Sequence, residues 1–181
     1  MANRLIPSGQ NEGSVELGTY SFTGVASISL PNNVFSTAFD NYQIHMNFKQ
    51  ITSAGNLSIR FRSAGSDIAT SGYYLGAQGW SHAGAAINRA VSNGSAFILN
   101  GATTQKADDT LANSVNVTVF NALSTARKNI FYDFTYWNSS DVQNALTGGG
   151  FNSTGSVGDS LTFLTSAGTM TGTVYVYGMR I

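Results

Sequence analysis

The alternation of apolar and polar residues is clearest between Phe39 and Arg62, where two period-2 stretches flank a short polar segment. Successive side chains of a strand point to opposite faces, so each stretch predicts a strand with one buried and one exposed face. The segment between them, Ser53-Ala54-Gly55-Asn56, predicts that the two strands pair as an antiparallel hairpin. The apolar residues on the predicted inner face are Tyr42, Ile44, Met46, Phe48, Leu57, Ile59 and Phe61.

Shorter patterns of the same kind recur along the chain, separated by Gly, Asn and Ser turns. They predict strands at 20–23, 25–30, 72–78, 96–100, 113–120, 129–137, 160–165 and 172–180. Residues 81–89 read as a loop or one helical turn, 141–146 as a short helical piece, and Gly148-Gly149-Gly150 as a flexible break. Eight or nine short strands without helical crossovers predict an all-β, antiparallel, jelly-roll-like sandwich.

Chain length fits one domain with a full core, which we place at residues 19–181 of the 181-residue chain. Residues 1–18 are polar, contain Pro7 and three glycines, and show no sustained periodicity. Two interpretations of this segment stay open: a frayed terminus, or an arm that docks onto a neighbouring subunit or scaffold.

Charged residues make up only 10% of the chain, against the roughly 25% usual in soluble domains. Nine basic and nine acidic residues cancel and form no basic stripe, which argues against nucleic acid as a partner. Cysteine is absent, which excludes disulfides and thiolate metal sites. We expect neither a secretory signal nor membrane insertion, because no sufficiently long apolar run occurs. A weakly charged surface suits a protein that works within an assembly.

The chain offers little for catalysis. Its two histidines, His45 and His82, lack metal-binding spacing, and Asp108-Asp109 lacks that of a calcium loop. No G-x-S-x-G elbow is present. Asp133 lies mid-strand among aromatic residues, either as a base with a raised pKa or as an ordinary hydrogen-bonded strand residue. We therefore predict a protein that is not an enzyme and has no cofactor, metal or catalytic residue.

Aromatic residues are the stronger lead. Beside amide and hydroxyl groups, aromatic rings can stack on sugars, although a place in the core or at a subunit interface is the more common role for each such residue. The candidate ligand or interface aromatics are Tyr73, Tyr74, Trp80, Trp137, Tyr175 and Tyr177. The polar face of the predicted hairpin supplies candidate subunit contacts, since arginine binds carboxylates well across interfaces. These candidates are His45, Lys49, Arg60 and Arg62.

Four segments, in order, resemble a known family: SFTGVASISL at 21–30, FDNYQI at 39–44, LSIRFRSAG at 57–65 and TGTVYVYGMR at 171–180. Together they resemble small β-sandwich proteins and fibre-tip domains on the virions of tailed bacteriophages. The resemblance covers about residues 21–181 and implies a jelly-roll-like, often trimeric, non-enzymatic virion surface protein. It supplies no catalytic residues, and the chain departs from the fibre-tip version in having no coiled coil, collagen-like repeat or β-helical shaft before residue 20.

The resemblance implies a location on the virion surface after assembly in the host cytoplasm, with two possible placements. As a tail or fibre-tip protein, slightly preferred, the chain would bind a host-surface glycan or protein and dock on a tail adaptor through residues 1–18. As a capsid decoration (cement) protein, homotrimers would sit on the head lattice, with residues 1–18 on the capsid protein. A carbohydrate-binding module is the third possibility.

Overall fold

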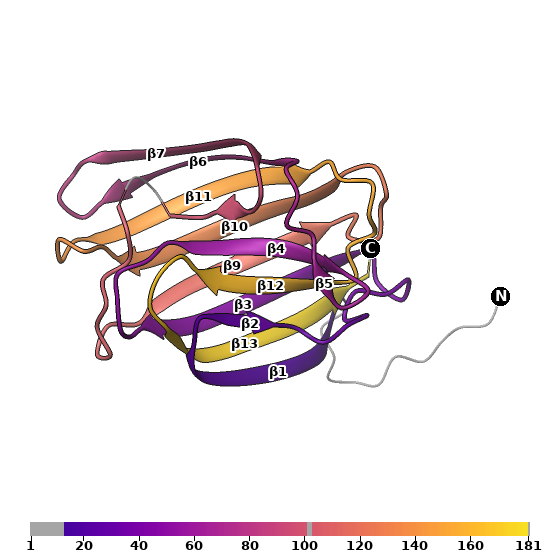
Figure 1. Cartoon of the computed structure of the whole chain (residues 1–181), viewed down its shortest axis with the longest axis horizontal. Coiled ribbons are helices and arrows are strands. Elements are labelled where there is room, and N and C mark those ends of the chain that lie inside the picture. Colours follow the sequence, from indigo (N-terminus) through magenta and orange to yellow (C-terminus); the bar gives the residue numbers. More distant parts are fainter. Residues whose placement is uncertain (1–12, 101–102, 181) are drawn as a thin grey trace.

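The structure is a computed structural model that describes residues 13–100 and 103–180. Two antiparallel β-sheets pack face to face as an all-β, jelly-roll-like sandwich (Figure 1), which confirms the predicted fold class. The larger sheet contains, in spatial order, β1 (Ser14–Val25), β13 (Met170–Met179), β3 (Asn41–Gln50), β9 (Asn113–Phe120), β10 (Lys128–Trp137), β11 (Gln143–Asn152), β6 (Tyr73–Ser81) and β7 (Ala86–Gly94). The smaller sheet contains β2 (Ser27–Ser29), β12 (Ser160–Thr165), β4 (Leu57–Ser63) and β5 (Ser66–Asp67), with β8 (Phe97–Ile98) also paired to β4.

The two strands that the sequence predicts as a hairpin lie in different sheets. β3 pairs with β13 and β9, whereas β4 pairs with β12, β5 and β8. Their apolar faces were predicted correctly, because both are buried, but they meet the core from opposite sides. A period-2 pattern specifies which face is buried and not which strand is the neighbour, so the predicted pairing was wrong.

A buried glutamine holds the segment that crosses between the sheets. Gln50, the last residue of β3, is fully buried, and its Nε2 donates to the carbonyl oxygens of Ser53 and Ala167, each at 2.7 Å. Gly55 also pairs with Gln105 as an isolated bridge, and a Cβ at Gly55 would overlap the Thr165 hydroxyl. These contacts carry the chain over the end of the sandwich instead of turning it back into the same sheet.

Several further boundaries differ from the sequence prediction. The predicted loop at 81–89 belongs mostly to the paired strands β6 and β7, and the predicted helical piece and glycine break at 141–150 belong mostly to β11. The chain therefore has 13 strands in its described part, more than the eight or nine predicted. No helix that could cross a membrane is found in the residues described.

The predicted arm is shorter than residues 1–18. Ser14 already pairs with Met179, so Ser14 to Gly18 are part of β1 at one edge of the larger sheet. Two register irregularities, between Glu16 and Gly18 and between Phe22 and Val25, interrupt this edge strand. The rest of the predicted arm, residues 1–12, lies outside the described residues.

One charged side chain is completely buried at an end of the core. The Lys128 side chain is 0% exposed, and its Nζ donates to the backbone carbonyls of Thr154 at 2.9 Å and Ser156 at 2.7 Å. Desolvation lowers the pKa of this ammonium below its ordinary value. Lys128 thus fastens the 154–156 segment to the sandwich through carbonyl groups, with no carboxylate paired to it among the described residues.

Candidate functional site

A groove crosses the outer face of the larger sheet over strands β7, β6, β11 and β10. It encloses about 520 Å³ and is centred on Trp80, whose side chain is 68% exposed. We call it the Trp80 groove; the residues that line it through outward-pointing side chains are Gln78, Trp80, Ala86, Asn88, Asp133, Thr135, Ala145 and Thr147. Tryptophan is highly buried on average, and an exposed indole in a concave site lined by polar groups makes this groove the best candidate for a binding site.

Strand register explains why the Trp80 ring stands clear of its neighbours. Trp80 lies directly opposite Ala145 of β11 on one side and Ala86 of β7 on the other. Side chains directly opposite each other on one sheet face are the closest neighbours in an antiparallel pair. Two methyl side chains cannot cover an indole, so most of the Trp80 ring remains exposed in the groove.

The adjacent register row supplies hydrogen-bonding groups. Asp133 of β10 is opposite Thr147 of β11, which is opposite Gln78 of β6, which is opposite Asn88 of β7. All four side chains point outward and are exposed. The amides both donate and accept, the threonine hydroxyl does the same, and the carboxylate accepts only.

A second hollow of about 550 Å³ continues the groove along the strands and shares Gln78, Asn88 and Thr147 with it. Its floor is Gly76 of β6 paired with Gly149 of β11, and a Cβ built on Gly76 would meet nothing within 4 Å. Phe131, opposite Gly149 on β10 and 46% exposed, forms one wall. The site therefore has an aromatic ring at each end and a floor of small residues between them.

The polar row continues past the groove to the other half of the sheet. Asp133 is opposite Asn116, Asn116 is opposite His45, and His45 is opposite Tyr175. His45 Nδ1 shares a hydrogen bond with Asn116 Oδ1, and the His45 and Tyr175 ring centroids are 6.1 Å apart. Asp133 is thus an exposed strand residue in a row of amide and hydroxyl groups.

The structure separates the six predicted aromatic candidates. Trp80 lies in the groove, whereas Trp137 is half-buried at the end of β10 outside its lining. Tyr175 and Tyr177 are half-buried on the outer face of β13, as their alternation with Val174 and Val176 predicts.

Tyr73 and Tyr74 point to opposite faces of β6. Tyr74 stacks on Phe151 with ring centroids 4.8 Å apart, so much of its ring is already covered. Tyr73 is 0% exposed; its hydroxyl donates to Ile68 O at 2.7 Å and accepts from Phe61 N at 3.0 Å. Burial raises the Tyr73 pKa above its ordinary range. The prediction that Tyr73 contacts a ligand was wrong, because Tyr73 is a core residue.

The four predicted subunit contacts do not form one surface. His45 and Lys49 lie on the outer face of the larger sheet, and Arg60 and Arg62 lie on the outer face of the smaller sheet, across the core. The two pairs of residues are separated because β3 and β4 belong to different sheets.

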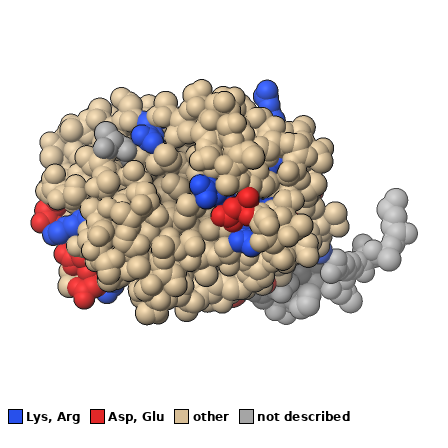
Figure 2. All heavy atoms as spheres, in the orientation of Figure 1, with Lys and Arg blue, Asp and Glu red and all other residues tan. Residues whose placement is uncertain are grey.

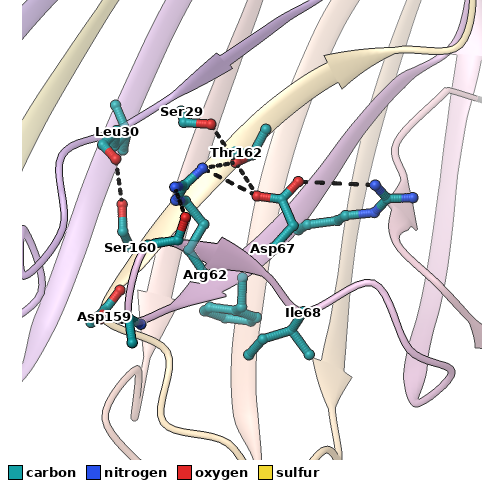
Figure 3. A network of polar contacts seen from close by, with 12 residues as sticks. Ser29, Leu30, Arg62, Asp67, Ile68, Asp159, Ser160 and Thr162 are labelled. Carbon is teal, nitrogen blue, oxygen red and sulfur yellow. Dashed lines mark hydrogen bonds and ion pairs between the residues drawn. The ribbon is translucent and has the colours of Figure 1, made fainter.

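Both arginines are held within the chain by Asp67 (Figure 3). Arg62 Nη1 lies 3.2 Å from Asp67 Oδ1 and 3.1 Å from Thr162 Oγ1, and Arg60 Nη1 lies 3.9 Å from Asp67 Oδ2. Thr162 Oγ1 also donates to Asp67 Oδ1 at 2.6 Å. Figure 2 shows the face formed by the smaller sheet, where charged side chains are sparse and those near its centre are of both signs. This network stabilises the β4–β5 turn and leaves little capacity for a partner.

Sequence reasoning missed Asn88, Thr147 and Phe131. Asn88 lies on β7, in the segment 81–89 that was predicted as a loop or one helical turn. Thr147 lies on β11, between the predicted helical piece at 141–146 and the predicted glycine break. Without a predicted strand, the outward direction of these side chains could not be assigned. Phe131 points to the outer face of β10, whereas its neighbours Ile130 and Tyr132 point to the core. An aromatic residue on the outer face of a strand is itself a signal of a functional face.

Comparisons with known proteins give little beyond the fold. No protein-family model and no curated protein matches the chain. A solved structure that aligns with it is the galectin LEC-6 of Caenorhabditis elegans, at 10% identity, covering 87% of this chain and 94% of that chain with a TM-score of 0.34. The candidate site is therefore argued from its own geometry. Within the described residues, no group of three or more His, Asp or Glu could hold a metal ion.

Proposed function

We propose that this chain is a non-enzymatic attachment module on the virion surface of a tailed bacteriophage, of tail or fibre-tip type, and that it binds a host-surface glycan in the Trp80 groove. The resemblance of its sequence segments supports the virion placement. The observation that carries the glycan assignment is the exposed Trp80 ring beside a row of hydrogen-bonding side chains.

The groove matches the two-sided chemistry of a sugar. One face of a pyranose ring presents C–H groups that stack on an indole, while its hydroxyls donate to and accept from amides and hydroxyls. Trp80 supplies the first contact, and Gln78, Asn88 and Thr147 supply the second. Ligand sites commonly combine an apolar wall with a few polar groups that fix orientation.

Hydrolysis of the bound glycan is not part of the proposal. Glycosidases generally place two carboxyl groups about the scissile bond, one as acid and one as base or nucleophile. Asp133 is the one carboxylate among the residues that line the groove and its continuation. A binding module needs no second acid.

The test is adsorption of the purified protein to host cells and to their extracted surface polysaccharide, measured for wild type and Trp80→Ala. We expect the substitution to reduce binding at least tenfold with an unchanged melting temperature, because the ring is 68% exposed and contributes little to packing. Phe120→Ala is the matched control: Phe120 is an exposed aromatic on the same sheet face, outside the groove. Equal binding by wild type and Trp80→Ala would refute the proposal.

Capsid decoration is the second candidate, favoured by a different part of the same sheet face. Phe120 is 37% exposed, and Tyr177 is half-buried on β13, two strands away and one outward-facing position along the strands. Aromatic side chains of this kind are typical of subunit interfaces. Counting copies per particle separates the two placements, because a decoration protein occurs in hundreds of copies and a tail-tip protein in few.

A further inference from the structure

We infer that the Trp80 groove selects an uncharged oligosaccharide lying diagonally across strands β6, β11 and β10, and that Asp133 excludes glycans carrying acidic sugars. The inference rests on the proposed function and adds to it the chemical class of the ligand and the residue that sets it.

The positions of the two exposed rings set the direction and length of the ligand. Trp80 is on β6. Phe131 is two strands away on β10 and two outward-facing positions farther along the strand direction. At a strand spacing of about 4.8 Å and a rise of about 3.4 Å per residue, their Cα atoms are roughly 16 Å apart. A single sugar cannot contact both rings, so the site fits a chain of several sugars.

The floor between the rings allows such a chain to lie close to the sheet. β11 lies between the strands that carry the two rings, and its outward positions along this path are Ala145, Thr147 and Gly149, all small residues. Bare backbone at the outward position of Gly149, beside Phe131, lets a ligand approach more closely than any side chain would permit.

The charge of the groove is set by one residue. Of the outward-pointing side chains that line the Trp80 groove, Asp133 is the one acidic group; the others are amide, hydroxyl, methyl or aromatic groups. It lies in the centre of the polar row, between Asn116 and Thr147. Among the residues of the paired strands, Arg89 is the cation nearest to Asp133, and it belongs to the adjoining hollow. It occupies an inward-facing position of β7, and its Nε is buried without a hydrogen-bond partner.

A ligand carboxylate bound near Asp133 would therefore meet a like charge without a compensating cation in the groove. At about 4 Å in a water-like medium the repulsion between two unit charges lowers affinity roughly fivefold, and more where water is displaced. A neutral hydroxyl at the same place instead donates a hydrogen bond to the carboxylate. Selection against acidic sugars follows from this difference.

The experiment compares two matched oligosaccharides, one neutral and one containing uronic acids, by calorimetric titration of the full chain at low salt. Wild type should bind the neutral ligand at least fivefold more tightly. Asp133→Asn should raise the ratio of uronate affinity to neutral affinity by about fivefold, and the effect should shrink at high salt because the charges are screened. Glu16→Gln is the control, with the same change in net charge on β1 at the opposite edge of the sheet, and should leave the ratio unchanged.

The outcomes separate this inference from the proposed function. Binding that Trp80→Ala abolishes, but that does not distinguish the two ligands or respond to Asp133→Asn, overturns the charge selection and leaves glycan attachment standing. A response equal in Asp133→Asn and Glu16→Gln also overturns it, since it would be an effect of net charge. Absence of any glycan binding overturns both.

Discussion

The three consecutive glycines of β11 provide a sharp test of the larger sheet, because they look alike in sequence and differ in structure. Gly148, Gly149 and Gly150 pair with β10 on one side and β6 on the other. Alternation along the strand places Gly148 and Gly150 on the core side and Gly149 on the outer side. We therefore expect alanine to be costly at the first and third positions and tolerated at the second.

The contacts of an added Cβ give the size of each effect. At Gly150 it would overlap the carbonyl oxygen of Tyr74 and lie 3.1 Å from the Phe97 ring, so the β11–β6 pairing itself must shift. At Gly148 it would lie 2.5 Å from Ala77 Cβ and 2.8 Å from the Tyr132 ring. Overpacking of this kind costs about 1 to 3 kcal/mol and occasionally more. We expect Gly148→Ala to cost about 2 kcal/mol and Gly150→Ala about 3 kcal/mol.

Gly149→Ala is the matched control. Its Cβ would lie 3.2 Å from the Ile130 carbonyl oxygen and 3.9 Å from the Phe131 ring, contacts that small movements accommodate. Restriction of the unfolded chain by alanine offsets part of this cost, by about 0.4 to 1 kcal/mol. The net change should be below about 1 kcal/mol.

Thermal and urea unfolding of the three variants would measure these differences. For a domain of this size, 1 kcal/mol shifts the melting temperature by about 2 to 4 °C, so Gly150→Ala should melt about 6 to 12 °C below wild type. Three equal, small shifts would refute the reasoning, because they would mean that 148–150 is the flexible break its composition suggests and not part of a paired strand.

Two further predictions concern buried polar groups, and two more follow from the proposed virion role. Tyr73→Phe should destabilise the protein by about 2 kcal/mol or more in urea unfolding, because it leaves the Phe61 amide and the Ile68 carbonyl without their buried partner; full stability would show that water replaces the hydroxyl. Burial lowers the pKa of Lys128, so the folded state loses this proton at a lower pH than the unfolded state does. The stability of wild type relative to Lys128→Met should therefore rise with pH until the ordinary lysine pKa of about 10.4 is reached, and a flat difference would contradict the desolvation argument. Removing residues 1–12 should leave the melting temperature unchanged and prevent incorporation into virions, as a comparison of purified particles would reveal. Light scattering should find a homotrimer at micromolar concentration, and a monomer would disprove that expectation.

Two strands were predictable to the residue. The predicted ranges 113–120 and 160–165 coincide with β9 and β12. In contrast, β7 and β11 are rich in Ala, Asn, Ser and Gly, and they are strands because β7 pairs with β6 and β11 pairs with β6 and β10. Such residues have weak intrinsic preference for strands, so tertiary packing decides their structure and local sequence does not reveal it.

The candidate site was predictable only in part for the same reason. Trp80 stands out in any sequence as a large aromatic residue among glycines. The residues that complete its groove come from β7, β10 and β11, and their convergence depends on strand order, which no local pattern encodes. Likewise Arg60 and Arg62 could be recognised as outward-facing but not as partners of Asp67.

The pairing of β1 with β13 has a consequence for biosynthesis. The first and last described strands lie side by side, and β13 also separates β1 from β3 in the larger sheet. A ribosome therefore releases β1 and β3 long before it completes the strand that joins them. Until then both present unpaired backbone edges, which are prone to wrong pairing with other chains. The larger sheet can close only after β13 has been synthesised, so a chain cut short before Met170 would leave β1 without a neighbour and expose one side of β3.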